Sequence, residues 1–509
     1  MKKRSLFIIP LTLISSTVFA QNEYDALRFS RSFQQGTARS TAMGGAFGAL
    51  GGDISCLATN PAGMSVYKRG ELTFTPQFIN CNSTSTINGF ESDDSKFSFK
   101  LANVGFVQSN YNPDKSGFKG WSWGIAFNRL MDFNGKRRVY GRNDNGSMLD
   151  VWKERANGLN VDGLHENGLQ YNVGLGYDCL LLDGDADYAN QYLSVHDNGW
   201  FGETGGYGEY QKFVSKTKGG LNSWDFAVSG NFDDKLFFGA SIGIETLRYK
   251  QTSTYSEDDK DNRVYYEYWD FKENIQDVGT GVNLKAGVIF KPVNYLRFGA
   301  AIHTPSWYQI EDKYYSEVKV LYDDNITYTD NNTGELKSEN SNQNNISPDS
   351  KYKYSLMTPF KAIASAAFIA PGKGLFSVDY EYVNYSMTQF SNEDWDSYDF
   401  EIQNEAIKNK LKGTSNIRVG AEVKCSPNVA LRAGYAIYGN PCKYIDKTFE
   451  RQIFSGGIGI GNQDVFFDLT GSYHLFETTK YLYESQNFIQ TYDMKNKALY
   501  ITMTFGVRF

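Results

Sequence analysis

From about residue 70 to the C-terminus, apolar and polar residues alternate with a period of two along many short segments. The last of them, ALYITMTFGVRF, shows the pattern clearly. Side chains of a β-strand point alternately to its two faces, so this segment predicts a strand with one apolar and one polar face. The apolar face holds Leu499, Ile501, Met503, Phe505, Val507 and Phe509.

Roughly fourteen such segments follow one another along the chain. The connections alternate between short ones, such as FDDK, APGKG and SPN, and longer ones rich in Asn, Asp, Ser and Tyr. This alternation is typical of an outer-membrane barrel, whose short periplasmic turns and long external loops lie on opposite sides. The expected strands lie near 70–79, 97–109, 119–133, 221–231, 235–252, 263–291, 296–320, 352–369, 374–390, 414–425, 428–439, 450–462, 464–484 and 496–509.

The predicted fold class is therefore all-β: an antiparallel transmembrane β-barrel of about 14 strands over residues 69–509. Barrel closure would satisfy every backbone group that lipid cannot. Two long external segments, near 134–219 and 321–351, interrupt the pattern, and short helices are expected near 148–156 and 392–412. Pro305 predicts a bulge within the strand that contains it.

The first twenty residues, MKKRSLFIIPLTLISSTVFA, combine a basic start, an apolar run and a small-residue cleavage site. This combination predicts a signal peptide over 1–20, with a mature chain that starts at Gln21. With the barrel pattern, it places the protein in the outer membrane of a Gram-negative bacterium.

Composition supports a barrel over a soluble α/β enzyme. Aromatic residues make up 16% of the chain and glycine occurs 49 times, while mean hydropathy is only −0.47. A net charge of −7 gives no support for nucleic-acid binding. The five cysteines follow no metal-binding pattern and allow one disulfide without selecting its pair, so no metal and no cofactor are expected.

Residues 21–68 precede the first strand and are too polar for lipid and too short for a separate domain. A lumen of about fourteen strands has room for them, which predicts a hatch, or plug, inside the barrel. The hatch contains GGAFGALGGDISCLATNPAG at 44–63. This glycine-rich run lacks the Gly-Lys-Ser/Thr ending of a phosphate-binding loop.

The run of small residues from 44 to 52, Asp53 followed by Ser55, and Asn60-Pro61-Ala62 before the first strand resemble the N-terminal hatch of the FadL/TodX (OmpP1) family of outer-membrane transporters. The resemblance covers about forty residues. It implies a monomeric barrel, closed by its hatch, that moves long-chain fatty acids or other hydrophobic small molecules. The alternative is a tight surface loop without a gating role. The hatch or gating residues implied are Gly51, Asp53, Ser55, Asn60, Pro61 and Ala62.

In this family, the substrate leaves sideways into the membrane through a gap at a kink in the third strand. The third expected strand here, WSWGIAFNRLMDFNG, loses its alternation at Asn128-Arg129. An arginine facing the middle of the bilayer would cost about 2–4 kcal/mol, which predicts a bulge or kink at this point. The alternative is that Arg129 lies near the outer head groups and reaches lipopolysaccharide phosphate.

Charged residues gather on the lumen side of the expected strands. Arg418 and Arg432 are candidates to bind a fatty-acid head group, because guanidinium groups suit carboxylates. The alternative is an ion-pair network that fills the barrel and holds the hatch. Asp379 and Glu381 form an acidic pair, but no nucleophile accompanies them, so the protein is not expected to be an enzyme.

Two further functions stay open from the sequence. A haem-binding receptor would use His303 or His474 as an axial ligand, although polar lumen groups explain both. A barrel of the same family could instead serve a protein secretion system. The loop at 322–335 lacks the spacing of a calcium loop. The expected partners are a hydrophobic ligand, outer-membrane lipid and lipopolysaccharide, and the barrel-assembly machinery through the strand that ends at Phe509.

Overall fold

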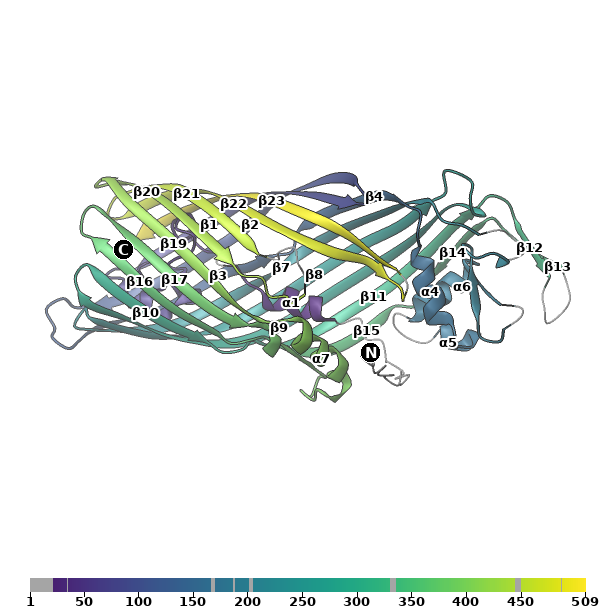
Figure 1. Ribbon diagram of the computed structural model, residues 1–509. Helices are drawn as coiled ribbons and strands as arrows, with labels where there is room; N and C mark the ends of the chain where they lie inside the picture. Colours follow the sequence, from purple (N-terminus) through teal and green to yellow (C-terminus); the bar gives the residue numbers. More distant parts are fainter. Residues whose placement is uncertain are drawn as a thin grey trace, which may run out of the picture.

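The structure, a computed structural model, describes residues 22–33, 35–165, 170–185, 188–200, 205–329, 336–444, 450–486 and 488–509. The signal peptide expected over 1–20 lies outside the described residues. Within the described part, neighbouring antiparallel strands pair in chain order and the last strand pairs with the first, which closes a 14-stranded barrel (Figure 1). The predicted fold class is confirmed.

All fourteen expected strands are present, in the expected order. Two are interrupted midway, so each is counted as a pair of elements. The barrel strands are β1 (Glu71–Ile87), β2 (Phe90–Tyr111), β3 (Phe118–Asp132), β7 (Glu209–Phe232), β8 (Leu236–Asp258), β9 (Tyr266–Val293), β10 (Leu296–His303) with β11 (Trp307–Tyr322), β15 (Ser350–Met357) with β16 (Lys361–Ala370), β17 (Gly374–Asn384), β19 (Gly413–Ser426), β20 (Val429–Tyr438), β21 (Arg451–Gly461), β22 (Val465–Glu484) and β23 (Ile489–Arg508).

The outward face is apolar around the periplasmic part of the barrel. On β23, Leu499, Phe505 and Val507 are exposed, whereas Thr502 and Thr504 face the lumen and are buried. The same alternation runs along the other strands and forms a belt, called the lipid belt below. Its exposed members include Phe74, Trp121, Trp123, Phe226, Phe238, Ile242, Leu284, Val288, Phe376, Tyr380, Tyr382, Ile417 and Val423. An outward apolar band of this kind is what a lipid bilayer requires.

Strands β1, β2 and β7 extend well beyond their expected ends. The polar stretch 80–96 forms the upper parts of β1 and β2, and β7 begins at Glu209 rather than near 221. These extensions stand above the lipid belt, where the outward face meets water and only a few inward residues, such as Ile87 of β1 and Phe213 of β7, pack in an apolar cluster. No alternation is needed there, and hence none is visible in the sequence.

Both interrupted strands contain a proline at the same level of the wall. Residues 304–306, with Pro305, separate β10 from β11, and residues 358–360, with Pro359, separate β15 from β16. Ser306 N donates to Thr358 Oγ1 at 2.8 Å, and Thr358 N donates to Ser306 O at 3.0 Å, so the wall stays closed. Opposite β9, residues 304–306 face only 283–284, so the bulge predicted from Pro305 is confirmed, and it also interrupts the strand.

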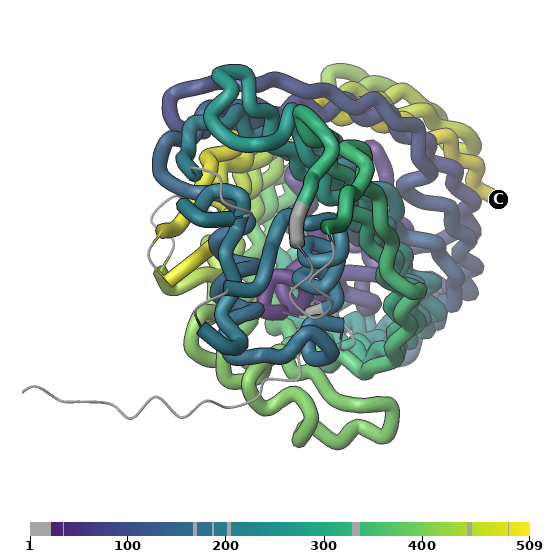
Figure 2. Tube along the Cα trace, turned by 90° about the vertical axis from the view of Figure 1, so that its right-hand side faces the viewer, coloured from purple at the N-terminus to yellow at the C-terminus, as the bar shows by residue number. Residues whose placement is uncertain are grey.

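A separate layer covers the external mouth of the barrel (Figure 2). It is formed by residues 144–208, called the lid below, of which 166–169, 186–187 and 201–204 lie outside the described part. The expected helix near 148–156 is confirmed within it. The lid contains α4 (Met148–Ala156), α5 (Val161–Leu164), α6 (Gln170–Asp178), β5 (Leu182–Gly184) and β6 (Tyr192–Ser194), while β4 (Gly135–Asn143) leads into it along β7.

The remaining short strands extend the external hairpins. They are β12 (Ile326–Thr329), β13 (Leu336–Glu339), β14 (Asn342–Ile346) and β18 (Gln389–Ser391), with η3 (Tyr385–Met387), η4 (Tyr398–Phe400) and α7 (Glu401–Lys410) between β17 and β19. No helix in the described ranges is long and apolar enough to cross a membrane. All five cysteines are free thiols.

Candidate functional site

The N-terminal segment lies inside the barrel. It forms α1 (Glu23–Ser30), α2 (Ala38–Ala42), α3 (Cys56–Thr59) and η1 (Pro61–Val66), drawn in purple within the strands in Figure 1. Its backbone bonds to strands all around the wall. Thr470 Oγ1 on β22 donates to Ala38 O at 2.6 Å, Ser455 Oγ on β21 to Ala42 O at 3.0 Å, and Ser241 Oγ on β8 to Leu57 O at 3.1 Å.

Glycines let the hatch backbone approach the wall. A Cβ added to Gly434 would lie 2.2 Å from Gly44 N, and one added to Gly299 would lie 2.3 Å from Gly48 O. A Cβ on Gly239 would lie 2.6 Å from Pro61 O. Real Cβ atoms do not tolerate such distances, so these wall positions accept the hatch only as glycine. Many of the chain's glycines are explained by this packing.

Asn60 connects the hatch to the wall opposite. Its side chain is buried, and its Nδ2 donates to Gly48 O at 2.7 Å and to Val288 O of β9 at 3.2 Å. Its Oδ1 accepts from Ala62 N at 3.2 Å, which begins η1 directly after Pro61. A single amide therefore fixes the turn and joins it to two other backbones.

Asp53 closes the hatch upon itself. Its carboxylate accepts from Thr37 Oγ1 at 2.8 Å and from Ser55 Oγ at 2.6 Å, and all three side chains are buried. Nearby, Gly51 has φ +63° and a Cβ there would lie 2.6 Å from Gly63 O. These contacts give the hatch a defined shape. A gating role for the six residues implied by the sequence stays a prediction.

The lumen arginines lie in ion pairs at the level of the hatch. Arg418 NH1 is 3.0 Å from Glu381 Oε2, and its NH2 is 3.6 Å from Asp379 Oδ2. Arg432 contacts Glu422 at 2.6 Å and Asp468 at 2.5 Å, and Glu422 also holds Arg39 of the hatch at 3.0 Å. A head-group role for Arg418 or Arg432 would require either to release a carboxylate.

A cavity of about 240 Å³ lies in the lumen beside α1, lined by α1, β3, β4, β21, β22 and β23 among others. Of the described side chains that line it, one is acidic, Asp132. Aromatic and apolar groups such as Phe133, Phe476, Met494 and Tyr500 complete its wall. The cationic side chains are Arg28, Lys136, Arg137, Arg451 and Lys480. Cations combined with apolar wall suit an amphipathic anion.

The ladder between two wall strands stops beside this cavity. The ladder between β2 and β3 ends at the pair Asn103 and Asn128, whose side chains bond at 2.8 Å. Higher up, β1 meets β4 directly, where Ser83 Oγ donates to Lys136 O at 2.9 Å. Between these two contacts no β2–β3 pairing is recorded among the described residues. We call this interval the window.

The window lies at the level of the lipid belt. Asn103 pairs with Thr75, and β1 then runs upward beside β23 past Ile501 and Leu499, two outward residues of the belt. The register of β3 with β7 shifts between Arg129 and Met131. Arg129 is largely buried and contacts Asp132 at 3.3 Å. The predicted bulge is therefore present, and it turns Arg129 away from lipid.

The two lumen histidines have protein partners. His303 Nε2 lies 2.8 Å from Thr59 O of the hatch. His474 Nε2 lies 3.1 Å from Ser472 Oγ, and its ring stacks on Tyr500 with centroids 4.0 Å apart. Of the two, His474 lines the cationic cavity. A haem-ligand role for either stays a prediction.

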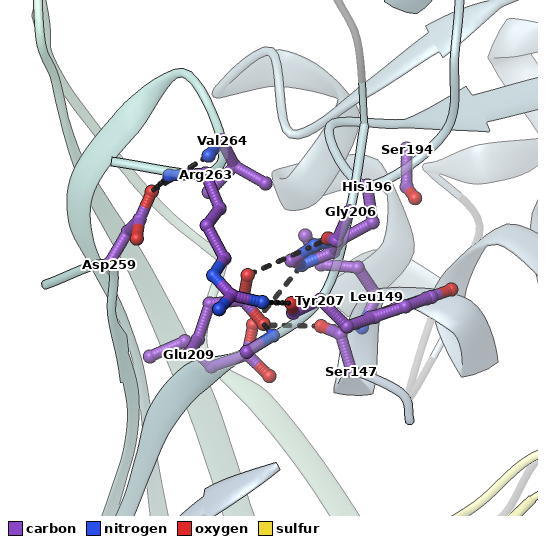
Figure 3. A network of polar contacts seen from close by, with 12 residues as sticks. Ser147, Leu149, Ser194, His196, Gly206, Tyr207, Glu209, Asp259, Arg263 and Val264 are labelled. Atoms are coloured by element: carbon purple, nitrogen blue, oxygen red, sulfur yellow. Dashed lines mark hydrogen bonds and ion pairs between the residues drawn. The ribbon is translucent and has the colours of Figure 1, made fainter. Parts of the chain in front are cut away.

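A buried charge cluster that sequence reasoning missed joins the lid to the barrel (Figure 3). His196 Nδ1 donates to Gly206 O at 2.7 Å and lies 3.8 Å from Glu209, while its Nε2 lies 3.4 Å from Glu257 Oε2. Glu257 also accepts from Ser147 Oγ at 2.8 Å and Trp269 Nε1 at 2.9 Å. These residues come from distant parts of the chain, so no local sequence motif indicates that they form a cluster.

The cluster stands far above the membrane, since Glu209 is fifteen residues along β7 from Trp224 of the lipid belt. Burial would lower the pKa of His196, but the hydrogen bond with Glu257 and the charge of Glu209 raise it to about 9. Burial raises the pKa of Glu209 to about 7. Although burial opposes it, the hydrogen bond with His196 holds the pKa of Glu257 below its usual value.

A scan against protein-family models finds no match, and neither does a search of curated proteins. Solved structures do match. A FadL homologue of Pseudomonas aeruginosa aligns with a TM-score of 0.54 and 10% identity, covering 94% of this chain and all of that one. The P. putida toluene transporter TodX aligns with a TM-score of 0.50 and 10% identity, covering 94% and 99%. The chain thus has the FadL/TodX-type fold, an outer-membrane β-barrel that holds its N-terminal segment in the lumen.

Proposed function

We propose that this protein transports hydrophobic molecules with an anionic head group, such as long-chain fatty acids, passively across the outer membrane. The observation that supports this proposal most directly is the cation-lined cavity next to the window in the wall. The fold supports the broader class, since the similar structures include a toluene transporter. The cavity favours a charged amphiphile over a neutral hydrocarbon, because its lining combines apolar groups with five basic side chains. Two of these, Arg28 and Lys136, are paired with Asp25 and Asp94, which leaves Arg137, Arg451 and Lys480 for the head group.

The geometry suggests a route. A ligand held in the cavity would lie beside the first part of the hatch and next to the window, so it could leave sideways into the outer leaflet without passing α2, α3 and η1. Arg28 and Gln35 of the hatch line the same cavity. Movement of this first part of the hatch would therefore gate the passage, while Asn60 and Asp53 keep the rest in place.

Uptake of labelled oleate tests the proposal, in a strain without its own fatty-acid channel. Expression of this protein should restore uptake. Arg451→Gln and Lys480→Gln should each lower it about tenfold, because a hydrogen bond to a charged group contributes about 1.5–3 kcal/mol. Lys497→Gln, on the outward face of β23, is the matched control and should leave uptake unchanged.

Toluene uptake by the same strains separates head-group recognition from general damage. Toluene has no charge, so the two cavity variants should transport it as well as the unchanged protein does. A folded barrel that restores no oleate uptake would refute the proposed function. Equal losses for oleate and toluene would refute the role of the cavity cations.

A further inference from the structure

The connection between β17 and β19, residues 385–412, leaves the barrel wall at the edge of the lipid belt. We call it the overhang. The ladder between the two strands ends at Asn384 and Gly413, two residues beyond the exposed Tyr382. At about 3.3 Å per residue, the overhang starts only about 7 Å above that ring. By contrast, β8 and β9 stay paired up to Asp258, fourteen residues beyond the exposed Ile244.

The overhang projects sideways from the barrel. Figure 1 shows α7 beside the wall rather than above the mouth, and the end-on view in Figure 2 places this light-green segment outside the ring of strands. The lid, in contrast, lies over the mouth. A segment that starts at the edge of the lipid belt and extends outward from the wall lies over the surrounding membrane.

The overhang is folded around buried apolar side chains of its own. Phe390, Phe400 and Ile407 are fully buried and pack against Tyr354 of β15 and its neighbours. Asn404 on α7 fixes β18 through two hydrogen bonds: Phe390 N donates to its Oδ1 at 2.8 Å, and its Nδ2 donates to Phe390 O at 2.9 Å. The apolar groups needed for folding are thus already inside.

Four large apolar side chains nevertheless stay outside. Met387 is 48% exposed, Trp395 41%, Tyr398 80% and Ile402 55%. Trp and Tyr concentrate where membranes meet water, since their rings combine an apolar body with a polar group. Tyr380 and Tyr382, which precede the overhang on β17, are exposed aromatic residues as well.

Charge along the overhang is divided. The first part is acidic, with Glu393, Asp394, Asp396, Asp399, Glu401 and Glu405, and Glu393 contacts Lys353 at 2.9 Å. The last part is basic, with Lys408, Lys410 and Lys412 where the chain rejoins the wall at Gly413, although Lys410 is paired with Glu23 of α1 at 2.7 Å. Lys443 joins them, since its Nζ donates to Lys408 O at 2.6 Å. The basic part therefore lies closest to the strand ends and to the head groups of the surrounding lipid.

We propose that the overhang anchors the protein on the surface of the outer leaflet: Met387, Trp395, Tyr398 and Ile402 enter the head-group region, and Lys408 and Lys412 contact lipid phosphate groups. This proposal is independent of the transported molecule. It assigns to residues 385–412 a partner, outer-leaflet lipid, that the transport route does not require.

Spin labels test it in the full-length protein, reconstituted in vesicles of phosphatidylcholine and phosphatidylglycerol. Tyr398→Cys and Ile402→Cys are labelled in a background whose five native cysteines are replaced by serine. Leu336→Cys on β13, 74% exposed and remote from the wall, is the control. Collisions with oxygen, which enters lipid, relative to a water-soluble nickel chelate should be several-fold more frequent at both overhang positions than at Leu336. Equal ratios would overturn the proposal.

A second measurement needs no cysteine replacement. Brominated lipids quench tryptophans that lie in the membrane. Trp395→Phe should remove a quenchable share of the emission in such vesicles, whereas Trp152→Phe, inside the lid, should remove only unquenched emission. An unquenched contribution from Trp395 would contradict the anchor.

Discussion

The hatch and the lid both obstruct the barrel, but they are attached in different ways. The hatch meets the wall mainly through its backbone, at glycines on both sides and through hydrogen bonds to main-chain atoms. The lid meets the wall through large side chains, with Trp152, Trp200 and Trp269 in one buried apolar cluster, and through the buried charges of His196 and Glu257. We therefore expect the hatch to be destabilised by larger side chains at its contact glycines. We expect the lid to be destabilised by loss of the buried side chains that hold it.

The largest effect should come from removing one charge beneath the lid. Glu257→Gln removes the nearer of the two carboxylates around the buried His196 and leaves only Glu209, 3.8 Å away, as its counter-charge, which costs up to about 3–5 kcal/mol. The lid should open locally while the barrel stays folded. Hydrogen exchange and limited proteolysis of the lid helices measure this.

The control is Glu311→Gln on β11, whose carboxylate is exposed and lies 2.8 Å from Lys351. It should leave lid exchange unchanged, because exposed ion pairs contribute little. Equal protection of the lid in the Glu257 variant would show that the apolar cluster alone holds it.

The hatch, unlike the lid, should be disturbed by added side-chain volume rather than by a lost partner. In Gly434→Val, the new side chain would enter the backbone of the hatch at Gly44, at a cost of about 1–3 kcal/mol. The hatch should be displaced from its contacts with the wall, and single-channel conductance in planar bilayers should rise. Gly456→Ala on the adjacent strand is the control, because its Cβ would meet nothing closer than 3.7 Å. An unchanged conductance would mean that the hatch shifts without opening a path.

These two regions also show how far the sequence could lead. The period of two and the alternating loops predicted all fourteen strands, since lipid imposes a strict pattern on each strand, and Pro305 predicted one bulge. The glycine-rich run predicted a tightly packed hatch. The polar upper parts of β1, β2 and β7 were not predicted, because a strand face that meets water does not need alternating apolar residues. The cavity cations Arg28, Arg137, Arg451 and Lys480 come from four separate elements, and only closure of the barrel brings them together.

The lid should also respond to pH, with a smaller effect. The pKa of His196 is raised to about 9 in the folded protein, so its stabilisation is complete below about 6.5 and is lost as pH rises through 9. The raised pKa of Glu209, about 7, acts in the same direction. Lid protection should fall by about 1–3 kcal/mol between pH 6 and about 9.5. The rate of lid exchange, corrected for the intrinsic pH dependence, measures it.

If the protection of the lid did not depend on pH, the ionised pair of His196 and Glu257 would be contradicted. His196→Gln provides the control, since it removes the ring that titrates near pH 9 and should abolish the fall in protection above about pH 8, leaving only the contribution of Glu209 near pH 7. Conductance through the hatch should not follow the same profile, because most of the hatch contacts described above are hydrogen bonds and close approaches of the main chain, which do not titrate.

The smallest effect tests whether directional bonds, rather than close packing alone, hold the hatch. Asn60→Ala removes the amide that bonds Gly48 O, Val288 O and Ala62 N, yet adds no volume. A loss of about 1–2 kcal/mol is expected, because two buried carbonyls lose a donor. The hatch should stay in place but open briefly, seen as short conductance events rather than a steady rise. Asn60→Asp keeps the acceptor for Ala62 N and loses the two donor bonds, so it should behave like the alanine variant. If it behaves like the unchanged protein, the turn into η1 matters more than the bond to the wall.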